Sequence, residues 1–153
     1  MKSPKNLNVL VALFSLFAFA GFIDASYLTV EHYLGTPIPC SVFGGCDIVT
    51  NSSYSQIGGV PLALVGALYY LSLIIFCIIY FDSRKTGTLK IASYIVVPAF
   101  LVSLWLVYLQ FFVIHAICLY CMISATISLV LFVIGQITLS SLRNKSEIPI
   151  LNT

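Results

Sequence analysis

Four long apolar stretches, separated by shorter segments that carry most of the polar residues, dominate this sequence of 153 residues. The stretches span about residues 8–30, 60–81, 91–114 and 116–142. A helix needs roughly 20 apolar residues to cross the hydrocarbon core of a bilayer, and each stretch meets that length. The pattern therefore predicts an all-α membrane protein whose single domain, residues 1–153, is a bundle of four transmembrane helices.

The connections between the stretches differ in length and composition. Residues 31–59 form a long connection rich in Gly, Pro and Ser, which can fold back over one end of the bundle. The third and fourth stretches are joined by a tight turn at His115, so we expect them to form an antiparallel helical hairpin.

The composition agrees with a chain that lies in lipid. Hydrophobic residues make up 60% of the chain and charged residues 8%, whereas a soluble domain carries about 25% charged residues. The net charge of +2 is small and no Gly-rich phosphate-binding loop is present, so a nucleic-acid partner is not expected. The partner that the composition predicts is the lipid bilayer.

The seven Lys and Arg residues predict the orientation of the chain, because cytoplasmic loops are enriched in these residues. In a four-span arrangement all of them fall on one side, at Lys2, Lys5, Arg84, Lys85, Lys90, Arg143 and Lys145. We therefore expect both termini in the cytoplasm and residues 31–59 on the outer side. The alternative is a signal peptide cleaved after Ala18-Phe19-Ala20, but the first apolar stretch continues well beyond Ala20.

Four of the five cysteines are predicted to lie on the outer side, which is the oxidising side of a bacterial membrane. Cys40 and Cys46 lie in the long connection, where Gly44-Gly45 is expected to let one sulfur move. Cys118 and Cys121 form a Cys-x-x-Cys pair where the last helix begins, a position that lowers thiol pKa. Cys77 lies deep in the second stretch and is expected to be a small packing residue.

Three interpretations of the outer cysteines compete. Two structural disulfides would staple the connection and the helix end, but a bridge across a two-residue gap gains little stability. A zinc ion bound by four thiolates would need reduced thiols in an oxidising compartment. A redox relay between two exchanging dithiols fits both short spacings, and it is the interpretation that we favour, with no metal expected.

The same cysteines, with Ser52 six positions after Cys46 and Gly58-Gly59-Val60-Pro61 before the second stretch, resemble the vitamin K epoxide reductase family. The resemblance is to its bacterial and archaeal branch and covers about residues 24–125. It implies a four-helix bundle around a quinone pocket that an extracytoplasmic loop caps. It also implies a thioredoxin-fold partner that gives electrons to the loop cysteines.

The resemblance implies a role for each of these residues. Cys40 would form the mixed disulfide with the partner, and Cys46 would exchange with Cys118. Cys121 would be the sulfur nearest the quinone. Ser52 would hold the loop closed by hydrogen bonding, although it can equally be an ordinary loop serine.

Three further residues are candidates near this site. Asp24 is the one acidic residue within an apolar stretch, and ionisable residues inside a membrane are functional candidates. His115, three residues before Cys118, could stabilise a thiolate or could be an ordinary surface histidine. Tyr120, between the two thiols, could contact the quinone or could be a packing aromatic.

Two departures from the family pattern bear on the substrate. The animal enzymes carry a tyrosine where this chain has Ala125 and an asparagine where it has Leu62. Menaquinone or ubiquinone is therefore the expected acceptor rather than vitamin K or its epoxide. The chain ends at Thr153 without a thioredoxin-like domain, so the partner is expected to be a separate protein.

The function that follows is that of a quinone-coupled thiol–disulfide oxidoreductase. It would serve disulfide formation in exported proteins and lie in the cytoplasmic membrane of a bacterium or archaeon. A reductase of quinone or quinone epoxide is the nearest alternative. A non-enzymatic membrane scaffold with structural disulfides is the alternative of another class.

Overall fold

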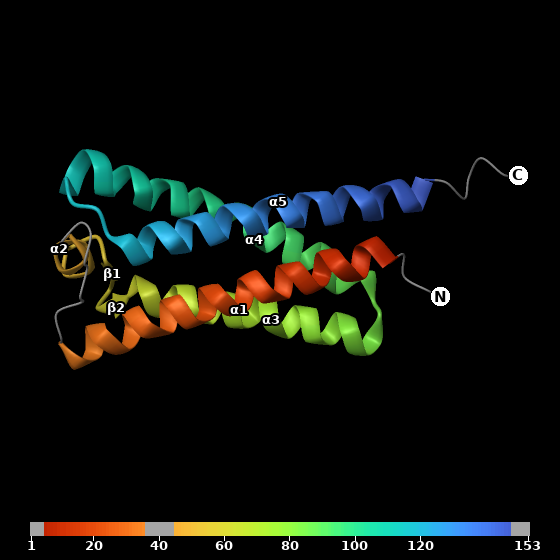
Figure 1. Ribbon diagram of the computed structural model, residues 1–153, viewed down its shortest axis with the longest axis horizontal. Helices are drawn as coiled ribbons and strands as arrows, with labels where there is room; N and C mark the ends of the chain where they lie inside the picture. Colours follow the sequence, from red (N-terminus) through yellow and green to blue (C-terminus); the bar gives the residue numbers. More distant parts are fainter. Residues whose placement is uncertain (1–4, 36–44, 148–153) are drawn as a thin grey trace, which may run out of the picture.

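A computed structural model of the chain describes residues 5–35 and 45–147. It contains four long helices, α1 (Lys5–Leu34), α3 (Leu62–Ser83), α4 (Thr86–Leu109) and α5 (Leu119–Glu147). These helices lie side by side along the long axis of the molecule (Figure 1). Within the described residues, four helical segments are long and apolar enough to cross a membrane. The predicted four-helix membrane fold is therefore confirmed.

Four short elements complete the described part of the fold. The helix α2 (Cys46–Thr50) and the strands β1 (Gln56–Ile57) and β2 (Val60–Pro61) lie at the end of the bundle opposite the two termini (Figure 1). The π-helix η1 (Gln110–Ile114) continues α4 towards the same end. All four elements therefore belong to the end of the bundle that holds the long connection.

The β1–β2 hairpin was not expected in an all-α chain. Its strands pair antiparallel, and the two residues between them, Gly58 and Gly59, have φ angles of 60° and 83°. A two-residue hairpin turn of this kind requires positive φ at both positions, which glycine adopts without a steric penalty. The hairpin leads the chain directly into α3.

Several helix ends differ from the apolar limits of the sequence; helix α5, for example, ends at Glu147 rather than at residue 142. Helix α1 continues to Leu34, past the expected end at residue 30, and stops at Gly35, whose φ is 64°. Helix α4 begins at Thr86 rather than at residue 91. Hydropathy marks where apolar side chains end, but backbone hydrogen bonding continues into the polar boundary layer. As a result, Glu31 and His32 belong to the last turns of α1 rather than to the connection.

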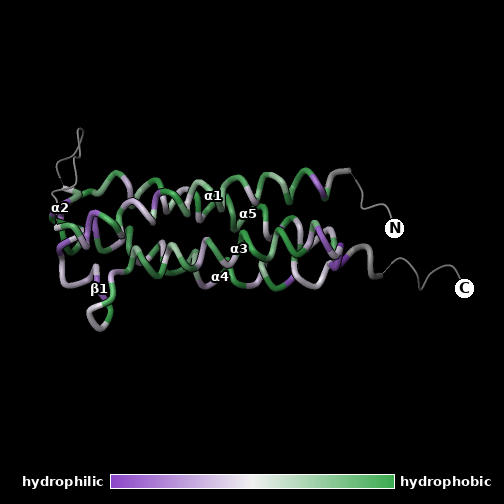
Figure 2. The backbone as a smooth tube through the Cα atoms, turned by 90° about the horizontal axis from the view of Figure 1, so that it is seen from below, coloured by the Kyte–Doolittle hydropathy of each residue, from purple (hydrophilic) through white to green (hydrophobic). Residues whose placement is uncertain are grey.

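The core of the bundle packs aromatic rings against small residues. The largest fully buried side chains include Tyr80, Leu73 and Leu131. Cys77 is 1% exposed, free, and part of this core, so its predicted packing role is confirmed. Large apolar side chains that face outward lie along all four helices, and hydrophobic positions dominate their length (Figure 2). This is the arrangement expected of a bundle whose outer surface contacts lipid.

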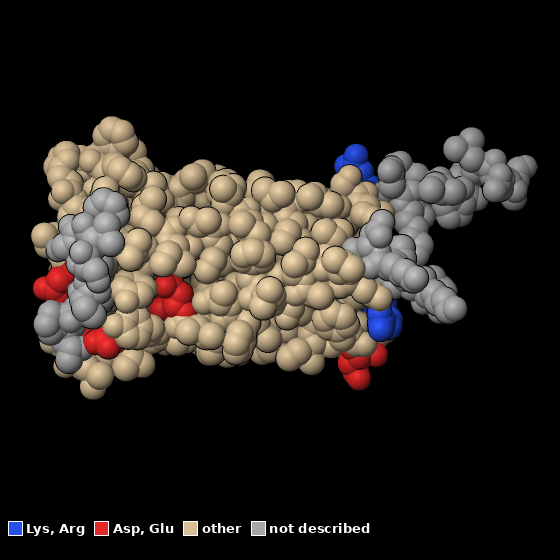
Figure 3. Space-filling model, viewed as in Figure 1, with Lys and Arg blue, Asp and Glu red and all other residues tan. Residues whose placement is uncertain are grey.

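Charged residues separate along the long axis. On the face shown in Figure 3, basic side chains lie only at the end near the chain termini. The described basic side chains belong to Arg84, Lys85, Lys90 and Arg143. Acidic residues gather towards the other end, with one more near the basic end (Figure 3). The middle of the bundle is left nearly free of charge, as a membrane span requires.

Candidate functional site: a thiol pair beside a buried cavity

The thiol pair lies at the start of α5, and the helix begins immediately after Cys118. The backbone N–H of Cys121 donates a hydrogen bond to the Cys118 sulfur at 3.3 Å. The Cys118 side chain thus occupies the capping position of the helix, where serine or aspartate oxygens usually accept this bond. Both thiols are free; Cys118 is fully buried and Cys121 is partly exposed.

The two sulfurs are not equivalent. The Cys121 thiol donates to the Cys118 sulfur and lowers the pKa of Cys118, while burial opposes this effect. Backbone N–H groups at the start of α5 act in the same direction as the thiol donor. Since the N-terminus of a helix stabilises negative charge, Cys118 is the sulfur prepared to exist as a thiolate.

A buried amide fixes the turn that carries Cys118. Gln110 is 2% exposed, and its side-chain oxygen accepts the backbone N–H of Cys118 at 2.9 Å. Its backbone oxygen accepts the N–H of Ala116 at 3.2 Å. Gln110 stands in the third apolar stretch, and η1, which directs its side chain back to Cys118, has no clear sequence signal.

The loop cysteine lies against this pair. Cys46 is disulfide-bonded and fully buried, and it shares a cluster of buried residues with Leu28, Val49 and Cys118. Cys121 packs against the same cluster. Cys40 lies outside the described residues. Three of the four outer cysteines are thus brought to one place, although Cys46 is more than 70 residues away from Cys118 in the chain.

A glycine makes this approach possible. A β-carbon on Gly45 would lie 2.7 Å from the backbone oxygen of Ile117 and 2.8 Å from its nitrogen. Any side chain at this position would therefore push α2 away from the turn that ends at Cys118. The sequence suggested conformational freedom for this glycine, but the structure shows close contact with backbone.

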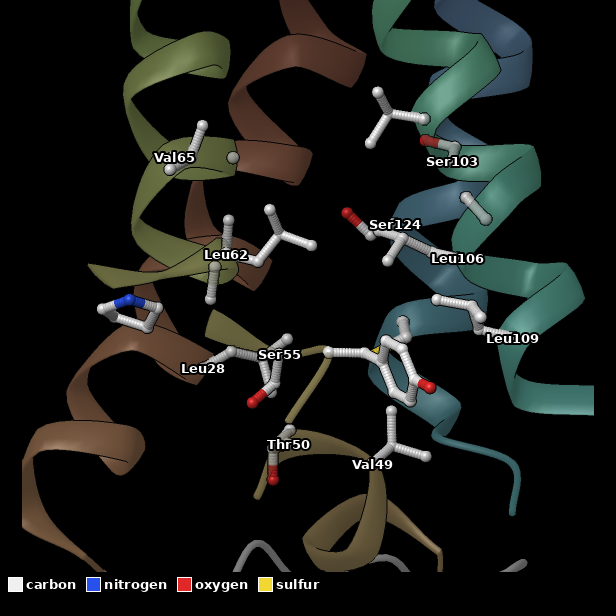
Figure 4. Close-up of a pocket in the computed structure, with 18 of the residues that line it drawn as sticks. Leu28, Val49, Thr50, Ser55, Leu62, Val65, Ser103, Leu106, Leu109 and Ser124 are labelled. Carbon is white, nitrogen blue, oxygen red and sulfur yellow. The ribbon is translucent and has the colours of Figure 1, made fainter. Parts of the chain in front are cut away.

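Beside the thiols lies a cavity of about 330 Å³, lined by residues of the four long helices and of the connection. Leu62 and Val65 of α3 face Leu106 of α4 across it (Figure 4). The Cys121 side chain lines the cavity, whereas Cys118 lies behind it among the buried residues. Polar residues of the wall include Gln110, Tyr70, Ser124 and Ser128.

Ser52 lines this cavity and holds the connection together. Its hydroxyl donates to the backbone oxygen of Val49 at 2.7 Å. Its own backbone oxygen accepts bonds from the backbone N–H and the hydroxyl of Ser55, at 3.0 and 2.7 Å. Ser52 therefore joins α2 to the hairpin, and its described hydrogen bonds are all local.

Two other candidates lie outside the cavity wall. The Tyr120 ring packs on Tyr27 of α1, with ring centroids 5.2 Å apart, and is not among the described residues that line the cavity. The structure thus gives Tyr120 a packing contact with α1. His115 is exposed on the turn, with a φ of 53°, and is likewise absent from the described lining.

Asp24 lies on α1, partly buried, with its carboxyl group next to the Ser124 side chain. One carboxyl oxygen, Oδ2, is fully buried and has no hydrogen-bond partner among the described residues. The structure thus brings Asp24 to the thiol site, together with residues that the sequence did not single out.

The fold and the site define a class: membrane-embedded helical bundles that hold a pair of redox-capable thiols beside a cavity lined by the helices. Within that class, the sequence model of the vitamin K epoxide reductase family matches residues 12–135, so the chain belongs to this family. The match includes all five cysteines. A search among curated proteins gives no match. Family membership makes the chain an integral membrane oxidoreductase.

Proposed function

We propose that the protein oxidises a separate thioredoxin-fold protein and passes the electrons to a membrane quinone. One observation carries the proposal. The disulfide-bonded Cys46 and the free Cys118 share one buried cluster, and Cys121 leads from that cluster into the cavity. This is a continuous route from a loop to a buried pocket, as a relay of dithiols requires.

The relay consists of two thiol–disulfide exchanges, each driven by a thiolate. A partner thiolate attacks Cys40 of the loop disulfide, and the second partner thiol then releases the reduced loop. Cys46 next attacks Cys118 of an oxidised Cys118–Cys121 pair and displaces the Cys121 sulfur. Attack of Cys40 on Cys46 then frees Cys118, so that two electrons and two protons have moved inward.

The redox states in the structure fit one stage of this cycle. Cys46 is oxidised while Cys118 and Cys121 are free thiols. This is the state expected after electrons have reached the inner pair and before they leave it.

The cavity fits the ring of a quinone. Its volume of about 330 Å³ falls at the lower end of ligand pockets, and apolar side chains form most of its wall. Gln110, Tyr70 and Ser124 would present hydrogen-bonding groups to the ring oxygens, with Cys121 on the same wall. A bound quinone supplies an acceptor for two electrons and two protons.

The cavity wall also bears on the choice of quinone. Leu62 and Ala125, the two departures from the animal pattern, both line the cavity. Neither can donate a side-chain hydrogen bond to a substrate oxygen. This favours menaquinone or ubiquinone as the acceptor over vitamin K epoxide.

The charge distribution supports the proposed orientation. The described basic side chains lie at the end near the termini, and the thiol site lies at the other end. By the positive-inside rule the termini face the cytoplasm, and the site opens to the outer side of a bacterial or archaeal cytoplasmic membrane. A partner that carries electrons from exported proteins would meet the loop there.

The test is quinol formation by the purified protein in detergent, with menaquinone or ubiquinone and either dithiothreitol or a reduced thioredoxin-fold protein. We expect Cys118→Ser and Cys121→Ser to abolish quinol formation from both donors. Cys40→Ser should abolish formation from the protein donor and spare formation from dithiothreitol. Cys77→Ala, in the core away from the site, is the matched control and should retain activity. Equal activity in all four variants would refute the relay.

A further inference from the structure

A polar cluster lies inside the apolar bundle next to the thiols. The Tyr70 hydroxyl lies 3.2 Å from the Ser124 hydroxyl and 3.2 Å from the Ser128 hydroxyl, and it donates to the backbone oxygen of Ser124 at 3.3 Å. The Asp24 carboxyl borders the Ser124 side chain. Residues of α1, α3 and α5 thus meet in one hydrogen-bonding group.

The helices make specific room for this cluster. A β-carbon on Gly21 would lie 2.5 Å from the Tyr70 ring, so the absence of a side chain on α1 lets the ring reach α5. Tyr70 is only 2% exposed. The bundle places this buried hydroxyl against α5 instead of filling the space with an apolar side chain.

Asp24 is the member of the cluster whose burial costs the most free energy. A carboxyl group within a membrane span is expensive, and its Oδ2 atom is buried without a hydrogen-bond partner among the described residues. Packing does not account for it, since an apolar side chain would fill the place at lower cost. The carboxyl interacts electrostatically with both Cys118 and Cys121, so its charge is coupled to the redox pair.

The charges of this group limit how protons can be arranged. A Cys118 thiolate and an Asp24 carboxylate would be two anions in a low-dielectric site, and like charges there disfavour each other strongly. The two groups together therefore hold one shared proton, and Cys121 holds another. Reduction of the Cys118–Cys121 disulfide brings in two electrons and two protons, and this group has a place for each proton.

We propose that Asp24 holds the second proton of the reduced site and delivers it through the Ser124 hydroxyl to the quinone oxygen in the cavity. This inference rests on the proposed function. When the thiol pair passes two electrons to the quinone, Cys121 gives up one proton and Asp24 the other to the quinone oxygens, and the Cys118–Cys121 bond forms. The negative charge that was on Cys118 is then on Asp24, so charge, electrons and protons balance.

Ser124 is suited to the transfer. It borders Asp24 on one side, and its side chain is directed into the cavity on the other (Figure 4). A hydroxyl can accept one proton while donating another. The Tyr70 hydroxyl lies within hydrogen-bonding distance of the Ser124 hydroxyl and holds it in place, and the Ser128 hydroxyl bonds to Tyr70 in turn. Asp24 thus acts on the quinone as a proton donor through Ser124 and does not touch the quinone itself.

The first test needs no quinone. Electrochemical reduction of the wild-type protein should bind one proton more per molecule than reduction of Asp24→Asn. Infrared difference spectra should show a protonated carboxyl band that appears on reduction in wild type and is lost in Asp24→Asn. Asp24→Glu should restore both signals. Asp82→Asn makes the same chemical change at an exposed position near the C-terminal end of α3 and should behave as wild type.

The second test separates proton storage from delivery. Ser124→Ala should leave proton uptake unchanged but slow quinol formation at saturating quinone by roughly 100-fold, the lower range for loss of an acid–base group. Ser124→Thr, which keeps the hydroxyl, should recover most of the rate. Equal proton uptake in wild type and Asp24→Asn would overturn the proposal. Failure of wild type to reduce quinone would instead refute the proposed function and leave the uptake result standing.

Discussion

Cys118 has three donors that favour its thiolate, the Cys121 thiol and the backbone N–H groups of Tyr120 and Cys121. The two sulfurs of one short motif therefore have different chemistry. Cys118 is buried towards the loop cysteine, and Cys121 opens into the cavity. At the scale of single residues, this asymmetry gives the relay its direction.

The thiol donor can be removed without removing Cys118. Cys121→Ala should raise the pKa of Cys118, whereas Cys121→Ser, which keeps a donor, should shift it less. A lowered pKa means that the thiolate persists below the ordinary cysteine value of about 8.5 and is lost as pH falls through the lowered value. The measurement is thiolate ultraviolet absorbance against pH, with Cys118→Ser as the blank. Identical titrations in the two Cys121 variants would show that the thiol donor has no effect.

Gln110 should matter for stability as well as for position. Gln110→Leu leaves the buried Cys118 N–H without its acceptor, which costs about 1–3 kcal/mol. Thermal unfolding in detergent should therefore occur at a lower temperature than in wild type. Thr126→Val removes an exposed hydroxyl that bonds only to its own helix and is the control, with little expected change. A Gln110→Leu protein as stable as this control would show that the hydrogen bond is dispensable.

At the scale of elements, the long helices were predictable and the short ones were not. An apolar stretch of about 20 residues has few stable alternatives in lipid, so α1, α3, α4 and α5 follow from hydropathy alone. By contrast, α2 has five residues and depends on the contact of Gly45 with the turn that ends at Cys118. The hairpin depends on the φ angles of Gly58 and Gly59.

The residues of the candidate site also fall into those that the sequence predicts and those that it does not. Cys46, Cys118 and Cys121 were recognisable because their spacing has chemical meaning. Gln110, Tyr70, Ser124 and Ser128 were not, because a lone amide or hydroxyl in an apolar stretch looks the same whether it faces lipid or a cavity. Only the packing of η1 and the removal of a side chain at Gly21 direct these groups inward.

Adding one methyl group at Gly45 tests whether α2 must pack closely against the turn that ends at Cys118. Gly45→Ala should displace α2 from the turn and slow electron transfer from the loop to the inner pair by about tenfold or more, as expected for a misplaced reacting group. Quinol formation driven by dithiothreitol acting directly on the inner pair should change little. Gly87→Ala, with open space around its β-carbon, is the control. Unchanged electron transfer in Gly45→Ala would show that the contact is not needed.

At the scale of the whole molecule, the account depends on which end faces outward. Single cysteines introduced at the exposed positions Ser53 and Thr86 lie at opposite ends of the bundle. A membrane-impermeant maleimide added to intact cells should label Ser53→Cys, and it should label Thr86→Cys only after permeabilisation. The reverse pattern would place the site on the cytoplasmic side and remove the proposed link to exported proteins.

At the same scale, the proposed relay depends on electron transfer between one pair of sulfurs, those of Cys46 in the loop and Cys118 in the bundle. A protein carrying Cys40→Ser and Cys121→Ser leaves these two without their neighbours. Mild oxidation followed by mass mapping should then give a Cys46–Cys118 disulfide. The control is the double variant Cys40→Ser, Cys118→Ser, which should form much less of a Cys46–Cys121 disulfide. If Cys46 and Cys118 both stay free under oxidation, electrons have no path from the loop to the cavity and the proposed relay is wrong.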